Sequence, residues 1–319
     1  MKFARSVLDV IGNTPTVELS RLVAGTGGRI FAKLEFLSPG GSKKDRVARH
    51  VLLQARLSGE LTPGQPVLEL TSGNMGTGAA IACAILGHRF IAVMSAGNSP
   101  ERVQMMRAFG GQVVLVPQAP NGLRGKVTGA DLERVAERAE QLTRTLGAFR
   151  IDQFARPSAA ETYQLETGPE LWEACGSQLT AFCDFVGSAG SFVGVSKALK
   201  ARSPTIRTYI VEPAGAAILS GQAVTEPAHI IQGGGYAMTD LPLLTGTLAS
   251  GFVQVTAAEA IATMRRLARE EGLFVGPSSG ANVAAALKLL EEDESGGAIA
   301  VLLSDSGTKY FSAGLWDSS

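Results

Sequence analysis

Two adjacent lysines, Lys43 and Lys44, stand at the start of an apparent helix, after a stretch rich in glycine and serine. Burial of such a loop would remove water from a lysine, lower its pKa and make its neutral amine a nucleophile or Schiff-base partner. The alternative is a solvated lysine pair at a helix start, and residues 38–46, taken alone, favour that alternative. Covalent chemistry here therefore depends on what the rest of the chain supplies.

Three further segments rich in glycine and hydroxyl residues lie where a strand pattern passes into a helix pattern, or directly before a helix. Free backbone N–H groups at a helix start can bind an anion such as phosphate. Ordinary capping or glycine turns are the alternative for each segment, and residues 185–191 match neither a P-loop nor a dinucleotide fingerprint. The segments are residues 68–76 (Leu-Glu-Leu-Thr-Ser-Gly-Asn-Met-Gly), 185–191 (Phe-Val-Gly-Ser-Ala-Gly-Ser) and 276–280 (Gly-Pro-Ser-Ser-Gly).

One ligand could use all four segments together. It would need an amine that binds it covalently, a cradle for phosphate, a polar contact to a ring and a separate site for a carboxylate. Pyridoxal 5'-phosphate with an amino-acid substrate meets this description. Because ligands of open α/β sheets bind at the carboxyl ends of the strands, the four segments could converge on one site.

The elements that must position these segments alternate between strands and helices. The strand candidates are continuous apolar runs, as expected of strands covered on both faces, so the pattern predicts an α/β protein with a mostly parallel sheet. Residues 117–129 are predicted to form a surface loop. The predicted strands are residues 66–70, 90–94, 113–116, 208–211 and 299–303, and the predicted helices are residues 131–146, 257–271 and 281–290.

Composition narrows the class of protein. A length of 319 residues predicts about two domains or subdomains, with 45% hydrophobic residues to build the cores. The 29 basic and 29 acidic residues balance, which argues against a nucleic-acid or anionic-membrane partner. No apolar run approaches the about 20 residues that span a bilayer, and no signal peptide is evident, so we expect a cytoplasmic protein. Cysteines without metal-ligand spacing predict buried thiols in a reducing compartment and no metal site: Cys83, Cys175 and Cys183.

The sequence resembles the cysteine synthase (O-acetylserine sulfhydrylase) family of pyridoxal-phosphate enzymes, which have the tryptophan-synthase-β fold. The resemblance extends along nearly the whole chain, and its motifs occur in the family's order. The segments that carry the resemblance are residues 11–15 (Ile-Gly-Asn-Thr-Pro), 42–46 (Ser-Lys-Lys-Asp-Arg), 71–74 (Thr-Ser-Gly-Asn), 99–102 (Ser-Pro-Glu-Arg), 153–154 (Gln-Phe), 167–170 (Thr-Gly-Pro-Glu), 231–233 (Ile-Gln-Gly), 276–280 and 305–310 (Asp-Ser-Gly-Thr-Lys-Tyr).

The resemblance implies fold type II of the pyridoxal-phosphate enzymes, with two open, twisted, mostly parallel sheets and helices on both faces. A small, mobile domain of residues 37–152 would carry the substrate carboxylate loop. Residues 1–36 and 153–319 would form the larger domain with the phosphate loop. A homodimer is implied, and so is a possible partner, the C-terminal tail of serine acetyltransferase.

The resemblance also implies a role for each matched residue. Lys44 would bind the cofactor covalently and move the substrate α-proton, while Lys43 would fill a variable, solvated position. Asn74 would bond the cofactor's ring hydroxyl and Ser278 its pyridine nitrogen. The phosphate would rest on Gly187, Ser188, Ala189, Gly190 and Ser191, and the substrate on Thr71, Ser72, Gly73, Met75, Gln153 and Gly233.

The implied reaction is β-replacement. The leaving group of an O-activated L-serine departs, and a nucleophile, sulfide in the parent family, adds at the β-carbon to give L-cysteine. Several departures from the family fall on the substrate side: Met75 stands where threonine is usual, Arg156 where asparagine is usual and Tyr163 where histidine is common, and residues 233–238 also differ. On the cofactor side, serines replace threonines in the phosphate loop.

The leaving group and the nucleophile stay open at this point. Ala214 follows Glu212 and Pro213, where family members that prefer O-phosphoserine place an arginine, so acetylserine is favoured. Arg156 is the alternative source of a phosphate contact. One alternative hypothesis is a β-replacement enzyme that uses O-phosphoserine, thiosulfate or an amine. Two others are a serine or threonine ammonia-lyase and a non-catalytic binding protein of the same fold.

Overall fold

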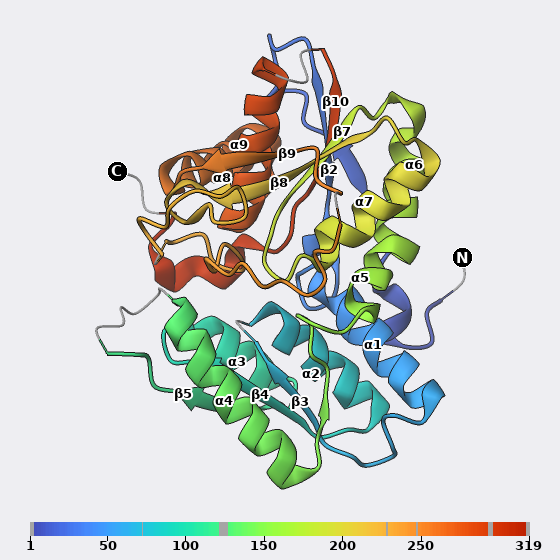
Figure 1. Cartoon of the computed structure of the whole chain (residues 1–319). Helices are drawn as coiled ribbons and strands as arrows, with labels where there is room; N and C mark the ends of the chain where they lie inside the picture. The colour runs from blue at the N-terminus through green and yellow to red at the C-terminus, as the bar shows by residue number, and fades with distance from the viewer. Residues whose placement is uncertain are drawn as a thin grey trace.

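The computed structural model describes residues 3–71, 73–120, 127–227, 229–246, 248–292 and 296–316. Its strands form two sheets, the larger in the upper half of Figure 1 and the smaller in the lower half. All strand pairs are parallel except β1–β2. In sheet order, the larger sheet is β1 (Thr16–Glu18), β2 (Arg29–Lys33), β10 (Ala298–Leu302), β7 (Ala181–Phe185), β8 (Arg207–Pro213) and β9 (Gly251–Val255), and the smaller is β5 (Gln112–Val116), β4 (Phe90–Ser95), β3 (Val67–Leu70) and β6 (Phe149–Arg150).

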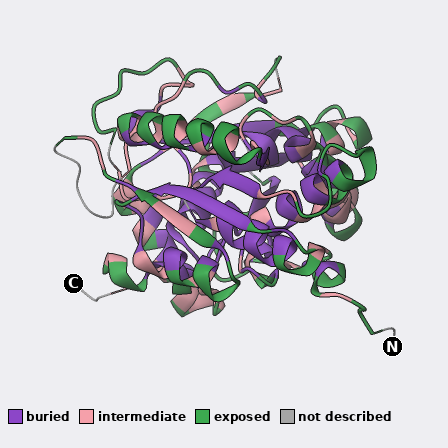
Figure 2. Cartoon of the chain, turned by 90° about the horizontal axis from the view of Figure 1, so that it is seen from below, coloured by how far each residue is buried: buried purple, intermediate pink, exposed green. Residues whose placement is uncertain are grey.

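Helices cover both faces of each sheet. On the smaller sheet, Leu68 and Val93 pack with α4, whereas Val67 and Ala92 on the opposite face pack with α2. On the larger sheet, α7 covers one face, and α8 and α9 cover the other. The strands between these layers are largely buried (Figure 2). The helices are α1 (Lys44–Ser58), α2 (Asn74–Leu86), α3 (Pro100–Ala108), α4 (Gly129–Leu146), α5 (Ser158–Thr162), α6 (Gly168–Cys175), α7 (Gly190–Arg202), α8 (Ala257–Glu271) and α9 (Pro277–Glu291).

The α/β architecture with two mostly parallel sheets confirms the fold predicted from the sequence. The five predicted strands correspond to β3, β4, β5, β8 and β10, and the three predicted helices to α4, α8 and α9. The last of these begins at Pro277, earlier than predicted, because a proline has no N–H to lose in the first turn of a helix. The predicted loop of residues 117–129 ends where α4 begins, and its residues 121–126 lie outside the described part of the chain.

The three cysteines are buried thiols, as predicted. Within the described residues, no helix has the length and apolar character needed to cross a membrane.

Helices α8 and α9 pack closely because Gly280 has no side chain. A Cβ atom at this position would lie 2.1 Å from the carbonyl oxygen of Ala260 and 2.9 Å from the Met264 Cβ. We expect Gly280→Ala to lower the free energy of unfolding by about 1–3 kcal/mol, the usual cost of overpacking. Urea denaturation measures the change. Gly129→Ala is the matched control, since a Cβ there meets only one atom at an ordinary 3.8 Å; equal stability of the two variants would contradict the prediction.

Candidate active site

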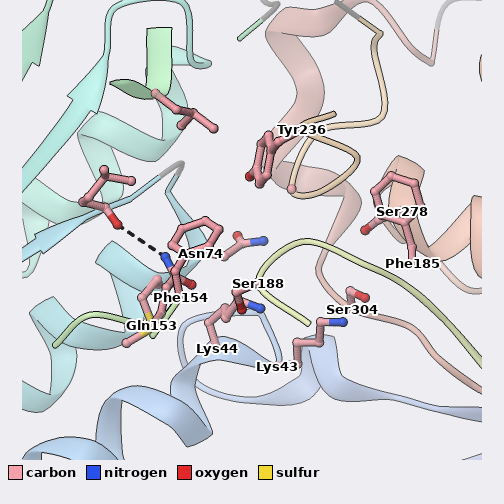
Figure 3. A pocket seen from close by; sticks show the side chains of 14 residues that line it. Lys43, Lys44, Asn74, Gln153, Phe154, Phe185, Ser188, Tyr236, Ser278 and Ser304 are labelled. Carbon is pink, nitrogen blue, oxygen red and sulfur yellow. Dashed lines mark hydrogen bonds between the residues drawn. The ribbon is translucent and has the colours of Figure 1, made fainter. Parts of the chain in front are cut away.

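A cleft of about 630 Å³, part of it open to solvent, lies at the carboxyl ends of strands from both sheets. Leu70 ends β3, Phe185 ends β7 and Ser304 follows β10, and all three line the cleft. Figure 3 labels Phe185 and Ser304 in its wall. This is the place where open α/β sheets bind ligands. Seven residues that the sequence singled out also line it: Lys44, Asn74, Met75, Gln153, Ser188, Gly233 and Ser278.

The two adjacent lysines differ sharply in their surroundings. Within the described residues, the Lys44 Nζ atom forms no hydrogen bond or ion pair with any side chain, and burial together with the neighbouring charge of Lys43 lowers its pKa to about 7. Lys43 Nζ instead lies 3.1 Å from Asp184 Oδ1 and 2.9 Å from Ser191 Oγ. A carboxylate partner keeps an ammonium group protonated, whereas a free amine of low pKa is a nucleophile. The geometry therefore favours Lys44 as the covalent residue.

The expectation that Lys43 is solvated is wrong. Its side chain is buried, and its ammonium group forms an ion pair with Asp184, which is fully buried at the end of β7. The same finding excludes a solvated lysine pair as the account of this segment. A signal was present in the sequence, since the strand that precedes the phosphate loop, Ala181–Phe185, places an aspartate among apolar residues. Such a carboxylate needs a cationic partner when it is buried.

The loop between β3 and α2 is braced by Thr71. Its Oγ1 atom accepts hydrogen bonds of 2.9 Å from the backbone N–H groups of both Gly73 and Gly76, so its hydroxyl organises the loop from behind. Gly73 has a φ of 131° and packs against Arg102, where a Cβ would meet that side chain at 2.3 Å. Met75 lines the cleft at the start of α2. Ser72, the remaining predicted substrate residue of this loop, lies outside the described residues.

Gln153 is held in the cleft wall by a buried carboxylate that the sequence analysis did not single out. Glu69 accepts backbone hydrogen bonds from Asp152, at 2.8 Å, and from Gln153, at 3.3 Å. The Gln153 amide in turn donates to the carbonyl oxygen of Leu70 at 3.3 Å (Figure 3). Asp152 has a φ of 54°, a conformation that non-glycine residues adopt only when their surroundings hold them there. Glu69 thus fixes an otherwise unfavourable backbone beside the cleft.

Burial raises the pKa of Glu69 to about 7. Its folded pKa therefore lies above the unfolded value of 4.5, so this group stabilises the fold fully below pH 4.5, and that contribution is lost as the pH rises through 7. We expect the free energy of unfolding of the wild type, relative to Glu69→Gln, to fall by up to about 3 kcal/mol between pH 4.5 and 8. Urea denaturation across this range measures it. The exposed Glu137→Gln control should show no such trend, and a flat difference for Glu69→Gln would contradict the prediction.

Asn74 is oriented by two charged neighbours. Its Nδ2 group donates to Asp305 Oδ2 at 2.7 Å, and its Oδ1 accepts from Lys309 Nζ at 2.9 Å. Asp305 is buried and also accepts a 2.7 Å hydrogen bond from the Tyr310 hydroxyl. Because both atoms of the amide are assigned, one N–H of Nδ2 is left to donate into the cleft.

The turn at residues 187–191 has the backbone of an anion site. Ala189 has a φ of 63° and precedes Gly190, the first residue of the 13-residue helix α7. Gly187 packs so closely against the loop at Gly233 that a Cβ on Gly187 would lie 2.5 Å from the carbonyl oxygen of Gly233. Ser188 lines the cleft, whereas the Ser191 hydroxyl donates to Asp184. N–H groups at such a helix start suit a phosphate.

Two hydroxyl groups complete the wall of the cleft. Ser278 lies in the first turn of α9, and Ser304 follows β10. The Ser304 Oγ atom is buried and has no hydrogen-bond partner in the described part of the chain, so it can still bond a ligand. An unpaired amine, a phosphate turn, an oriented amide and free hydroxyl groups together fit pyridoxal phosphate.

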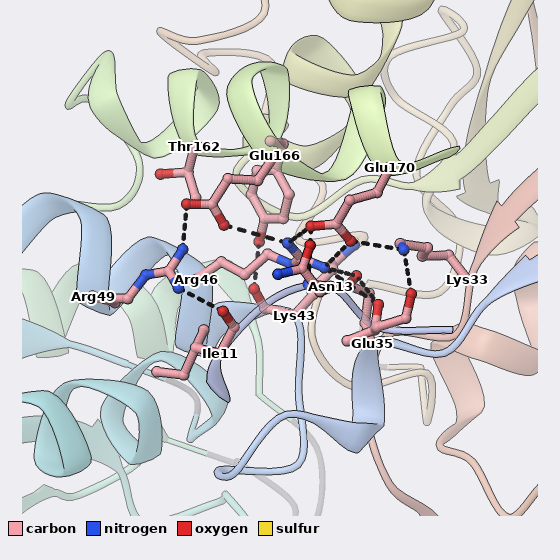
Figure 4. Close-up of polar contacts among 12 residues, drawn as sticks. Ile11, Asn13, Lys33, Glu35, Lys43, Arg46, Arg49, Thr162, Glu166 and Glu170 are labelled. Atoms are coloured by element: carbon pink, nitrogen blue, oxygen red, sulfur yellow. Dashed lines mark hydrogen bonds and ion pairs between the residues drawn. The ribbon is translucent and has the colours of Figure 1, made fainter. Parts of the chain in front are cut away.

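A buried ion network supports the helix that carries Lys44. Arg46 Nε and Nη2 each donate to Glu35 at 2.8 Å, and Nη1 and Nη2 donate to Glu170 at 2.6 and 2.8 Å (Figure 4). Lys33 Nζ adds a 2.7 Å ion pair to Glu170. Nearby, the hydroxyl of Tyr163, in a π-helix over Tyr163–Thr167, donates to the carbonyl oxygen of Lys43 at 3.2 Å. These contacts tie the start of α1 to the larger sheet.

The chain matches the family described as pyridoxal-phosphate dependent enzyme over residues 7–305. It belongs to this family. The chain is 34% identical to a probable cysteine synthase of Bacillus subtilis, with 99% of each chain covered, and 36% identical to the O-ureido-L-serine synthase of Streptomyces lavendulae, covering 99% of this chain and 94% of that protein. Among solved structures, an O-acetylserine dependent cystathionine β-synthase from Helicobacter pylori is similar, with a TM-score of 0.90, 30% identity and coverage of 99% and 100%.

These matches confirm the resemblance to cysteine synthases, fold type II and pyridoxal phosphate as the cofactor of this enzyme. The sequence did not single out every residue that forms the cleft of this pyridoxal-phosphate enzyme. The rings of Phe154 and Tyr236 lie 6.3 Å apart and form an aromatic wall, and Leu132 of α4 lines the cleft beside them. Leu132 and Phe154 lie outside the glycine-rich segments, and Tyr236 follows Gly233, Gly234 and Gly235 within residues 233–238, which the sequence marked only as different from the family.

Proposed function

We propose that this enzyme replaces the acetoxy group of O-acetyl-L-serine with sulfide, giving L-cysteine and acetate. The observation that carries the proposal is the free amine of Lys44, with its low pKa, in a cleft that also holds an oriented amide and a phosphate turn. The match to cysteine synthases supports β-replacement as the reaction class.

Each residue predicted to bind the cofactor or the substrate has a defined task in this proposal. The bound cofactor supplies an electron sink for the substrate α-carbon. Lys44 holds the cofactor, takes the α-proton and returns it after the nucleophile has added. Asn74 donates to the ring hydroxyl and Ser278 contacts the ring nitrogen. The substrate carboxylate lies against the loop at Thr71, Ser72, Gly73 and Met75, with Gln153 and Gly233, and the phosphate lies on Gly187, Ser188, Ala189, Gly190 and Ser191.

The surroundings of Arg156 support acetate over phosphate as the leaving group. Its guanidinium pairs with Glu60 at 2.8 and 2.9 Å and donates to the carbonyl oxygens of Arg150 and Ile151. Arg156 does not line the cleft. These contacts argue against Arg156 as a contact for a phosphoserine substrate, and Ala214 supplies no cation in its place.

A second candidate function is β-replacement by a nucleophile larger than sulfide. A neighbouring pocket of about 1070 Å³, including open solvent, shares Leu70, Leu132, Phe154 and Tyr236 with the active-site cleft. Residues of α4 and Met238 also line this pocket, and its exposed surface is mainly apolar. Sulfide needs no such space. An organic nucleophile could enter through this pocket, and two of the similar proteins are named for products other than cysteine.

Product analysis with the holoenzyme tests the proposal. We expect cysteine and acetate from O-acetylserine and sulfide, with kcat/KM at least about tenfold higher than for O-phosphoserine. A lyase would release pyruvate at a rate that sulfide does not suppress. Thiosulfate and amines tested in place of sulfide examine the second candidate. Absence of cysteine under all conditions, with a faster product from a larger nucleophile, would replace the first proposal by the second.

We further propose that the enzyme is a cytoplasmic homodimer, that serine acetyltransferase's C-terminal tail can dock in its cleft, and that residues 37–152 close on substrate as a unit. The four-stranded sheet and α1–α4 fall inside this range, which supports the boundaries. Light scattering on the purified protein tests the dimer, and a pull-down with the tail peptide tests the partner. Small-angle scattering with and without substrate tests the closure.

A further inference from the structure

A buried group of three charged or polar side chains lies directly behind the phosphate turn. Lys43 Nζ contacts both Asp184 oxygens, at 3.1 and 3.2 Å, and the Ser191 Oγ at 2.9 Å. Ser191 in turn donates its hydroxyl proton to Asp184. Asp184 is fully buried, and Lys43 and Ser191 are each 6% exposed. One member, Ser191, belongs to the turn itself, and another, Lys43, lines the cleft beside Ser188.

The stability of the fold does not by itself explain this ion pair. Desolvation of two buried charges commonly offsets their attraction, so apolar residues of similar size would stabilise this position equally well. The neighbours of Asp184 on β7 are apolar, and the only further side-chain contact that we find for its carboxylate, within the described residues, is a 3.2 Å hydrogen bond from Asn282. A cation retained beside a site for a dianion suggests a role in holding that dianion.

We propose that Lys43 is a phosphate-site residue whose charge Asp184 balances. When the phosphate lies on the 187–191 turn, the Lys43 ammonium group lies behind Ser191 and attracts the phosphate by its charge, while the Ser191 hydroxyl proton stays on its hydrogen bond to Asp184. The charge of the Lys43–Asp184 pair then sets how strongly the turn holds the phosphate. This inference rests on the proposed placement of the phosphate and is independent of the substrate.

The net charge of the pair gives an ordering of variants. Asp184→Asn leaves a single positive charge behind the turn, the wild type and the double variant Lys43→Met/Asp184→Asn are neutral, and Lys43→Met leaves a single negative charge. Charges act strongly on each other in buried surroundings. Affinity for the phosphate should therefore be highest in Asp184→Asn, intermediate in the wild type and the double variant, and lowest in Lys43→Met.

The test compares pyridoxal 5'-phosphate with pyridoxal, which forms the same covalent link but has no phosphate. Both are titrated into the cofactor-free full chain, and the ratio of the two dissociation constants isolates the phosphate contribution. We expect this ratio to favour the phosphate at least tenfold less in Lys43→Met than in wild type, to favour it more in Asp184→Asn, and to be close to wild type in the double variant. Lys197→Met, an exposed lysine on the same helix α7, is the control and should leave it unchanged.

A second readout uses inorganic phosphate alone and measures how far it raises the Tm of each cofactor-free protein. The rise should follow the same order of charge. If Lys43→Met does not fold, the ratio of dissociation constants and the Tm rise can still be compared between Asp184→Asn, the wild type and the double variant. Equal ratios and equal Tm rises in all folded variants would overturn the proposal. Loss of affinity for both forms of the cofactor would reduce Lys43 to a structural role. Neither outcome depends on which amino acid the enzyme converts.

Discussion

Lys44→Ala is expected to lower kcat for β-replacement by about 10³-fold or more, because this change removes both the covalent anchor and the base that moves the α-proton. Steady-state assays at saturating cofactor measure the loss. The cofactor's absorbance should also shift, since the variant cannot form the covalent link. The structure gives the physical reason for choosing this lysine: its amine is free in the described residues, and its pKa is lowered to about 7.

Lys43→Met is the matched control for this prediction. Lys43 is ion-paired with Asp184 and would act on the cofactor phosphate alone, so saturating cofactor should restore most of kcat. The two substitutions should therefore have different effects: Lys44→Ala lowers kcat, and Lys43→Met lowers the affinity for the cofactor. A Lys44→Ala protein that turns over at the wild-type rate would contradict the assignment.

Arg46→Met is expected to lower the free energy of unfolding by about 3–5 kcal/mol, the usual effect of removing one partner from a buried ion network. Arg46 is completely buried, and the change leaves the carboxylates of Glu35 and Glu170 without their main cation. Urea denaturation at pH 7 measures the loss. Arg144→Met is the control, since its pair with Glu140 is exposed and contributes at most about 1 kcal/mol.

The same network predicts an acid limit to stability. Hydrogen bonds and charge from Arg46 and Lys33, against the opposing effect of burial, hold the pKa of Glu170 at about 2, below its unfolded value of 4.5. Its stabilising contribution is therefore present above pH 4.5 and is lost as the pH falls toward 2. Arg46→Met should lose this part of the pH dependence. If Arg46→Met proved no less stable than Arg144→Met, the network would not be what fixes the start of α1.

The sequence was sufficient to predict the elements that form the site, and the reason is physical. Buried parallel strands are continuous apolar runs, and the loops that follow them meet at one edge of the sheet. The segments at 68–76 and 185–191 follow β3 and β7 for that reason, and residues of both line one cleft. Glycine and hydroxyl residues in these loops were therefore informative about chemistry.

Long-range polar contacts could not be predicted in this way. The partner of Lys43 lies 141 residues away, and that of Arg46 lies 124 residues away in Glu170. No local periodicity encodes such pairs, because they depend on how the two sheets are placed. The pairing of Lys43 with Asp184 was missed for this reason, and so was the pairing of Arg156 with Glu60.

We propose that Lys44, and not Lys43, binds the cofactor covalently. Borohydride reduction of the holoenzyme makes the link permanent, and mass spectrometry of the tryptic peptides then locates it. Because trypsin does not cut after a modified lysine, we expect a cofactor-bearing peptide that begins at Lys44 and continues through Asp45. A label on Lys43, or no labelled peptide from this segment, would contradict it.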